Sequence, residues 1–289
     1  MSRRMATSLL GKAALTAIAG SMLSLSAHAA TPADVNLGAA SDFTIFQRGG
    51  ANLEMSSGIL VNGNAALGPA GNQQFSANPQ ISGDYYTDPT ATNVDPTEVS
   101  IGGSHIVQDL SGAANDVADA SNALKALDGS LGATHTFGNV NGSTTITSVG
   151  SINIVEIGSI DLNASDLLTL TGGADDYFFI DVAGDGDFSA SSGIQLNGVD
   201  IAHVIFVWGG DLEQSGDSTL RGTHLVDGEY SSDGNLIGMV MAQGKLDLHS
   251  GGVVRAAHFA PVPLPASLPL FLSGLAGMAW LRRRNRQAA

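Results

Sequence analysis

Short runs of alternating apolar and polar residues constrain the fold of this 289-residue chain more than any other feature. Examples are Ile152-Asn153-Ile154, Leu168-Thr169-Leu170 and Leu246-Asp247-Leu248, and Gly, Ser, Asn and Asp separate such runs. Alternation with a period of two is typical of strands with one buried face, and the turn residues predict that each strand is brief. No proline interrupts the chain from Thr97 to Ala260, so long ladders are possible there. The fold is therefore predicted to be mainly β.

Internal similarity indicates how these strands are arranged. Ser56-Ser57-Gly58-Ile59 recurs as Ser191-Ser192-Gly193-Ile194, and Gly150-Ser151-Ile152-Asn153-Ile154 recurs eight residues later as Gly158-Ser159-Ile160-Asp161-Leu162. Units that cannot bury an apolar face alone do so by stacking on their neighbours. We expect a β-solenoid, and a β-sandwich with long connections is the alternative.

One segment has helical rather than strand periodicity. Residues 111–128 contain no proline, and the spacing of Leu110, Val117, Leu124 and Leu127 places them on one face of a helix. The segment is predicted to form a single amphipathic helix that ends before Gly129 and packs its apolar stripe against the solenoid.

The charge distribution excludes some classes of partner. Between residues 30 and 260 there are five basic residues and 27 acidic ones, a formal net charge of −22. A field of this sign repels nucleic acid and anionic lipid, so we expect no nucleic-acid binding. The absence of cysteine excludes disulfides, thiolate metal sites and cysteine nucleophiles.

Residues 1–29 have the order of features found in a secretory signal peptide. Arg3 and Arg4 precede an apolar stretch from Ala13 to Leu25, and Ala27 and Ala29 provide the small residues that signal peptidase recognises. We therefore expect a signal helix, with cleavage after Ala29.

The C-terminal segment, residues 261–289, combines a Pro-x-Pro motif, an apolar run and an arginine cluster. The run from about residue 266 to 281 is long enough for a transmembrane helix that spans the bilayer marginally, with the arginines on the cytoplasmic side. The motif and the arginine cluster consist of Pro263, Leu264, Pro265, Ala266, Arg282, Arg283, Arg284 and Arg286. A simple single-pass anchor is the alternative to a processed tail.

This arrangement resembles the PEP-CTERM sorting signal that exosortases recognise in Gram-negative bacteria, with Leu264 where the family usually has Glu. The resemblance implies an exosortase-type transpeptidase as a transient partner and cleavage near Pro263–Ala266. It also implies a transient inner-membrane anchor and transfer of the body to the cell surface or extracellular matrix.

The body, residues 30–260, resembles the ice-binding-like β-solenoid domains of secreted microbial proteins and the related choice-of-anchor surface domains. The similarity lies in the opening segment 36–45, in a helix about 70 residues later, and in the run Val204-Ile205-Phe206-Val207-Trp208-Gly209-Gly210. It implies a secreted β-solenoid with one flanking helix.

Several side chains are candidates for chemistry. Asp181, Asp185 and Asp187 in a Gly-rich turn could supply oxygen ligands to calcium, although solvated turn carboxylates account for the same pattern and no other cofactor is expected. Asp175, Asp176 and Asp181 are the candidate carboxylates of a polysaccharide-active enzyme.

Threonines on predicted strands are candidates for an ice-binding face, but they do not recur regularly along the sequence. They are Thr144, Thr145, Thr147, Thr169 and Thr171. The six histidines after the signal segment show no metal-binding spacing. Trp208 ends an apolar run and is predicted to lie in the core rather than to stack on a sugar ring.

The sequence thus favours an exported, noncatalytic surface or matrix protein that associates with exopolysaccharide or another surface glycan, or that supports aggregation or adhesion. The alternatives are a polysaccharide-active enzyme on a solenoid and an ice-binding or surface-binding module.

Overall fold

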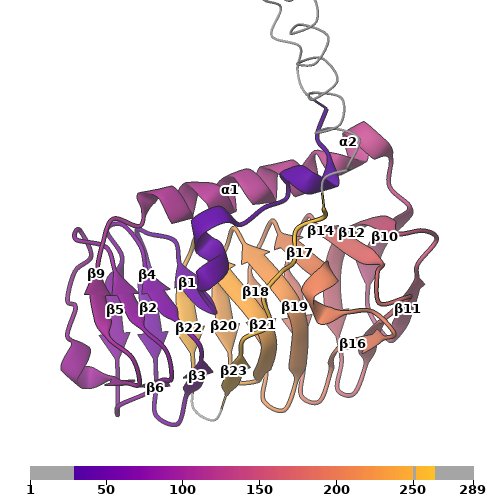
Figure 1. Ribbon diagram of the computed structural model, residues 1–289. Coiled ribbons are helices and arrows are strands. Elements are labelled where there is room, and N and C mark those ends of the chain that lie inside the picture. The colour runs from indigo at the N-terminus through magenta and orange to yellow at the C-terminus, as the bar shows by residue number, and fades with distance from the viewer. Residues whose placement is uncertain (1–28, 250–251, 264–289) are drawn as a thin grey trace, which may run out of the picture.

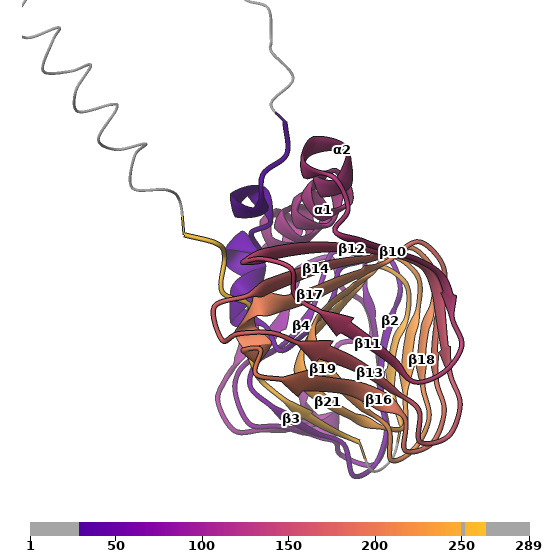
Figure 2. The same cartoon turned by 90° about the vertical axis from the view of Figure 1, so that its right-hand side faces the viewer.

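The strands of the protein wind into a parallel β-solenoid with three faces, which we call A, B and C (Figure 1). The structure is a computed structural model that describes residues 29–249 and 252–263. All strand pairs in this part of the chain are parallel, and Figure 2 shows the coils stacked behind one another around a common interior. The expected β-solenoid is confirmed, and the β-sandwich alternative is wrong because stacked coils pair in parallel whereas sandwich strands pair antiparallel.

Each face is a ladder of brief strands. Face A contains β1 (Ile45–Gln47), β4 (Ala65–Leu67), β7 (Tyr85–Thr87), β9 (His105–Val107), β10 (His135–Val140), β14 (Tyr177–Val182) and β17 (Val204–Trp208). Face B contains β2 (Asn52–Met55), β5 (Asn72–Phe75), β15 (Gly186–Phe188), β18 (Leu212–Gln214), β20 (Tyr230–Ser232) and β22 (Leu246–Leu248). Face C contains β3 (Leu60–Asn62), β6 (Gln80–Ile81), β8 (Ser100–Ile101), β11 (Thr144–Thr147), β13 (Leu167–Thr171), β16 (Gly193–Asn197) and β23 (Val253–Arg255).

Three longer strands pass from one face to the next. β12 (Ile152–Leu162) leads from face A to face B, whereas β19 (Thr219–Val226) and β21 (Asn235–Ala242) lead from face C to face A. The two similar segments around Ile152 and Ile160 both lie in β12. The spacing of eight residues suggested two successive coils. The two segments instead form two sides of one coil, because β12 turns from face A to face B between them.

The order of the coils in space differs from their order in the sequence. β1 pairs with β4 on one side and with β21 on the other, so the first coil stacks on the last one. The chain therefore starts in the middle of the solenoid and winds outward to β9. It then crosses to the opposite end, at β10, and winds back (Figure 1).

The crossing is made by α1 (Ser111–Lys125), which is followed by the short α2 (Leu127–Leu131). The predicted helix over 111–128 is thus confirmed, but it is divided after Lys125, and the predicted end before Gly129 is wrong because α2 continues through Gly129 to Leu131. Its predicted apolar stripe, which includes Leu110, Val117 and Leu124, is buried against face A. Short 3₁₀ helices span η1 (Pro32–Asp34), η2 (Gly38–Asp42), η3 (Pro96–Glu98) and η4 (Ile201–His203).

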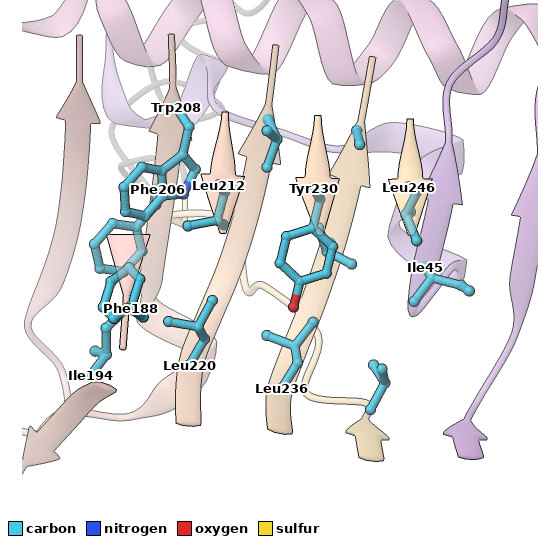
Figure 3. Close-up of a cluster of buried hydrophobic side chains, with 14 of the residues drawn as sticks. Ile45, Phe188, Ile194, Phe206, Trp208, Leu212, Leu220, Tyr230, Leu236 and Leu246 are labelled. Atoms are coloured by element: carbon cyan, nitrogen blue, oxygen red, sulfur yellow. The ribbon is translucent and has the colours of Figure 1, made fainter. Parts of the chain in front are cut away.

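Two apolar clusters hold the molecule together. Inward side chains from all three faces fill the solenoid, including Trp208 from face A, Phe188 from face B and Leu220 from face C (Figure 3). A second cluster lies between the outer side of face A and α1. Burying each large side chain contributes about 1.5–3 kcal/mol, so the helix is part of the fold rather than an appendage.

The described ends of the body also pack on the outer side of face A. Phe259 lies 6.3 Å, between ring centroids, from Phe179 on β14, and the Ala260 N–H donates to the carbonyl of Ala202 at 2.8 Å. At the N-terminal end, the Ala39 N–H donates to Asp116 of α1 at 2.8 Å. Face A is therefore covered by α1 and by both terminal segments, whereas no described helix covers faces B and C.

Candidate functional site

Stacked glycines form the corner between faces A and B. The N–H of Gly184 donates to the carbonyl of Gly158 at 2.8 Å, and the same contact is repeated from Gly210 to Gly184, Gly228 to Gly210 and Gly244 to Gly228. A Cβ on Gly228 would lie 2.5 Å from the carbonyl oxygen of Gly210. Only glycine permits this close approach of successive backbones, which fixes the coils in register at the point where face B begins.

The outward positions of face B form a row that is mostly acidic. Alternate residues of these strands point outward, and the strand register aligns them from coil to coil. In spatial order the row consists of Asp161, Asp187, Glu213, Ser231, Asp247, Glu54 and Gln74. Adjacent positions of such a row are about 4.8 Å apart because that is the spacing between paired strands.

A shallow groove of about 350 Å³ lies beside the first part of this row. Five carboxylates line it: Asp161, Asp185, Asp187, Asp211 and Glu213. Asp185 accepts a hydrogen bond from the Asp211 N–H at 2.9 Å, and Asp211 accepts one from the Glu229 N–H at 2.8 Å. These two carboxylates therefore stabilise the turns, while Asp161, Asp187 and Glu213 point into solvent.

A basic side chain balances the acidic residues of face B only outside the groove, near β20 and β22. The Lys245 ammonium lies 2.8 Å from a carboxylate oxygen of Glu229 and 2.8 Å from one of Asp247. Within the described ranges, no basic side chain forms an ion pair with the five carboxylates of the groove. The groove is therefore the part of face B that most strongly attracts hydrogen-bond donors and cations.

Face C carries two short polar rows near the β10 end of the solenoid. The register aligns Thr145 with Thr169 and Gln195, and Thr147 with Thr171 and Asn197. Thr144 is aligned with the buried Leu168 and belongs to the inner set. The threonines thus recur over two coils, after which Gln and Asn replace them.

The three calcium candidates do not form one cluster. Asp181 lies on the helix-covered face A, while Asp185 and Asp187 lie at the groove of face B. The separation arises because the chain turns a corner of the solenoid between β14 and β15. Nowhere in residues 29–249 and 252–263 do three His, Cys, Asp or Glu side chains come together in a group that could hold a metal ion.

Asp181 belongs instead to a charged cluster beneath the end of α1. Burial raises its pKa, and the nearby Lys125 partly opposes this effect. Burial and a side-chain hydrogen bond with Asp128 raise the pKa of Glu156, which is aligned with Asp181. Lys125 also pairs with Asp227 at 2.6 Å, and Asp227 in turn lies 3.1 Å from the buried Arg48.

The carboxylates considered for polysaccharide cleavage do not converge either. Asp176 accepts hydrogen bonds from the Ser148 hydroxyl at 2.6 Å and from the Gly173 N–H at 2.8 Å, and these bonds lower its pKa. It stabilises a turn, Asp175 is exposed beside it, and Asp181 lies on face A near Lys125 of α1. Glycoside hydrolysis requires two carboxylates on opposite sides of the scissile bond, and these three residues do not provide that geometry.

The histidine and tryptophan predictions can be checked at single residues. Trp208 is fully buried, as predicted, and its indole N–H donates to Nδ1 of His224 at 3.2 Å. Burial lowers the pKa of His224 to about 3. His135 lies on β10, His203 stacks on Tyr177 with ring centroids 3.9 Å apart, and both therefore have local packing roles.

The proposed processing signals lie mostly beyond the described residues. Ala29 and Pro263 are described, and both are exposed. Ala27, Leu264, Pro265, Ala266 and the arginines at 282, 283, 284 and 286 fall outside, as does the expected membrane segment 266–281. None of the helices formed by the described residues has the length and apolar character needed to cross a membrane.

The acidic row of face B was not predicted from the sequence, although a signal for it exists. Gly-x-x-acid recurs at Gly158 to Asp161, Gly184 to Asp187, Gly210 to Glu213 and Gly244 to Asp247. The glycine marks the corner, and the acidic residue three positions later faces outward on face B. The spacing of these units varies because the connections between faces differ in length, which hides the repeat.

Comparisons with solved structures agree with this architecture. An ice-binding protein from the Antarctic ascomycete Antarctomyces psychrotrophicus is 21% identical, with a TM-score of 0.52 over 77% of this chain and 98% of that one. A domain of an ice-binding protein from Shewanella frigidimarina is 16% identical, with a TM-score of 0.55 over 78% and 98%. An antifreeze protein from an Arctic yeast is 16% identical, with a TM-score of 0.54 over 82% and 99%.

No protein-family model matches the sequence, and no curated protein matches it either. At these identities the similarity concerns the fold. The chain therefore has the β-solenoid fold of the ice-binding proteins, which confirms the structural part of the resemblance seen in the sequence.

Proposed function

We propose that this chain is an exported, noncatalytic protein of the cell surface or extracellular matrix that binds polysaccharide, with face B as its main contact surface. The observation that carries the proposal is the outward row of face B. It is uncovered, regular along the solenoid axis, and acidic at Asp161, Asp187 and Glu213. A repeating surface of this kind suits a repeating ligand.

The chemistry of the row supports a glycan as the ligand. Carboxylates accept hydrogen bonds and bind sugar hydroxyl groups without the need for a cofactor. The acidic field disfavours polyanions, so an anionic polysaccharide would need divalent cations as a bridge. Calcium enters the proposal as a loosely held counter-ion of this face, not as the ligand of a site built from Asp181, Asp185 and Asp187.

The geometry of the row favours binding over catalysis. Asp161, Asp187 and Glu213 project from one side of one sheet, so all three would approach a glycan from the same side. Cleavage by paired carboxylates requires groups on both sides of the glycosidic bond. The polysaccharide-active enzyme is therefore the less favoured function.

Export and sorting form the second part of the proposal. Ala29 and Pro263, which flank the body, are exposed and thus accessible to signal peptidase and to an exosortase-type transpeptidase. The PEP-CTERM resemblance of the tail supports transfer of the body from the inner membrane to the surface. Deletion of residues 264–289 is expected to change the location of the protein without changing polysaccharide binding.

The test is co-sedimentation of the purified protein with exopolysaccharide of the producing cells, with and without calcium, while released sugar is assayed. The proposal predicts binding without sugar release. It also predicts that combined Asp161→Asn, Asp187→Asn and Glu213→Gln changes reduce binding at least about tenfold, since several charge-assisted hydrogen bonds are weakened. Sugar release, or unchanged binding by this variant, would contradict it.

Ice binding is a second candidate because the two threonine rows of face C lie on a solenoid that resembles ice-binding proteins. The candidate surface is the patch formed by Thr145, Thr147, Thr169 and Thr171. It predicts thermal hysteresis that is lost in Thr169→Tyr or Thr171→Tyr variants. No hysteresis at high protein concentration would exclude this function.

A further inference from the structure

The two ends of the solenoid expose apolar side chains. Val107 on β9 is 59% exposed and marks one end of the molecule (Figure 1). Leu131 of α2 is 56% exposed and Val149 after β11 is 69% exposed, and both are at the opposite end. These are the exposed large apolar side chains of the described chain, and all of them are at the ends.

The edge strands at these ends carry no formal charge, although the exposed Glu98 and Asp109 flank the β8–β9 segment. No Asp, Glu, Lys or Arg occurs in residues 99–108, which include β8 and β9, or in residues 129–155, which include β10 and β11. The body around them is strongly acidic. Two copies of the chain can therefore approach each other at these two edge strands with less electrostatic repulsion than at the acidic face B.

The edge strands at both ends have unused backbone hydrogen-bonding groups. Among the described strands β9 pairs only with β7, and β10 pairs only with β12. Soluble proteins usually protect such edges with charged residues, proline or a covering segment. Solenoids usually end in polar capping repeats. Neither β9 nor β10 contains a charged residue or a proline.

The two edges also match in direction and register. All strands run in one direction, so a copy placed beyond β9 would present β10 in the parallel orientation found throughout the solenoid. Following the register from coil to coil makes Val107 equivalent to Phe137. Val107 and the half-buried Phe137 both point toward the interior, so stacking would cover both side chains.

We propose that a second copy of this chain stacks end to end on the first, with the β10 end of one copy on the β9 end of the next. The interface is heterologous because different surfaces meet, so it repeats without closing and produces linear assemblies. Backbone hydrogen bonds between β9 and β10 set the orientation of the two copies, and burial of Val107 and Phe137 stabilises their contact. This self-association is independent of polysaccharide binding by face B.

The test is sedimentation velocity of the purified full-length chain over a range of concentrations, with electron microscopy of the concentrated samples. The proposal predicts linear species that grow with concentration and persist in high salt, since the uncharged edge strands associate through backbone and apolar contacts and not through ion pairs. A chain that remains monomeric at every concentration would overturn it.

Two variants and a matched control locate the interface. Val107→Lys places a charge at one end, and Val149→Lys places one at the other end, where Val149 is 69% exposed. Each is expected to weaken association about tenfold or more, because stacking would bury the added charge at a large cost in free energy. Ser231→Lys adds the same charge to the middle of the outward row of face B, away from both ends, and should leave association unchanged.

Thermal unfolding of all three variants checks that each one folds. If Ser231→Lys weakens association as much as the end variants do, the effect is one of net charge, and end-to-end stacking is wrong. If Val107→Lys and Val149→Lys fold and associate like the unchanged chain, the ends are not the interface.

Discussion

Faces A and B are built by the same coils around the same interior, yet one is buried and the other open to solvent. Their inward residues are alike, as Trp208 and Phe188 show. Their outward residues differ: face A presents Phe179, Val207 and Met241, while face B presents mostly carboxylates. The inward positions therefore determine the solenoid, and the outward positions determine which face receives α1 and which remains free for a ligand.

The largest effect on stability is expected when an outward side chain is truncated on each face in turn. Phe179→Ala should lower the free energy of unfolding by about 3–5 kcal/mol, because Phe179 is fully buried under α1 and its loss leaves a cavity. Asp187→Ala on face B should change it by less than about 0.5 kcal/mol. Denaturant unfolding measures both. Similar losses would mean that the two faces do not differ in the way described.

A pH series tests the interior that both faces share. His224 is neutral in the folded protein because burial lowers its pKa to about 3, whereas an unfolded histidine has a pKa of about 6.5. Only the unfolded state gains this proton as the pH falls between these values, so stability decreases by up to about 1.4 kcal/mol per pH unit.

Replacing that histidine isolates its contribution from those of the carboxylates. A His224→Phe variant should lack this part of the pH dependence, so the stability difference between variant and unchanged protein should shift in favour of the variant from pH 7 to pH 4.5. Denaturant unfolding at the two pH values measures the shift. If the stability difference between the variant and the unchanged protein were the same at both pH values, burial would not be lowering the pKa of His224.

The ion pairs provide a smaller test. Asp227→Asn removes the carboxylate between Lys125 and Arg48, whose side chain is only 4% exposed. We expect a loss of about 1–2 kcal/mol, since the buried guanidinium loses its charged partner while Asp227 itself is partly in water. Glu213→Gln on face B, which removes an unpaired carboxylate, should have an effect below about 0.5 kcal/mol. Equal effects in thermal unfolding would contradict the assigned contacts.

The smallest effect is expected at Asp181. Its raised pKa means that the charged form is disfavoured in the fold, so the stabilisation is present below the unfolded pKa of about 3.8 and is lost as the pH rises through the folded value. Asp181→Asn should therefore raise stability at pH 7 by a few tenths of a kcal/mol after solvent screening. The gain should shrink toward pH 4, and a loss of stability at pH 7 would contradict this assignment.

The sequence was sufficient to predict the strands, the solenoid and the helix because these depend on local patterns. Alternation around Leu168 and Leu246 marks inward positions, and helical spacing from Leu110 to Leu127 marks the helix. The order of the coils could not be predicted in the same way. The pairing of Ile45 with Val240 joins residues far apart in the chain, and neither strand contains a feature that specifies its partner.

The candidate site was also only partly accessible from sequence. Coil length varies, since Ile45 pairs with Ala65 20 residues later whereas Thr219 pairs with Asn235 16 residues later. Carboxylates that form one row on face B therefore lack a fixed period. Conversely, Asp181 and Asp187 are close in the sequence but lie on different faces, because a corner of the solenoid separates them.

The most direct test of the central claim, that face A is sealed and face B open, is thiol labelling of single-cysteine variants. The chain has no cysteine of its own, so each variant reports one position. The thiol of a Glu213→Cys variant, on exposed face B, should react at nearly the rate of a free thiol. The thiol of a Met241→Cys variant, beneath α1, should react at least about a hundredfold more slowly, because labelling there requires local opening. Equal rates at the two positions would contradict the account.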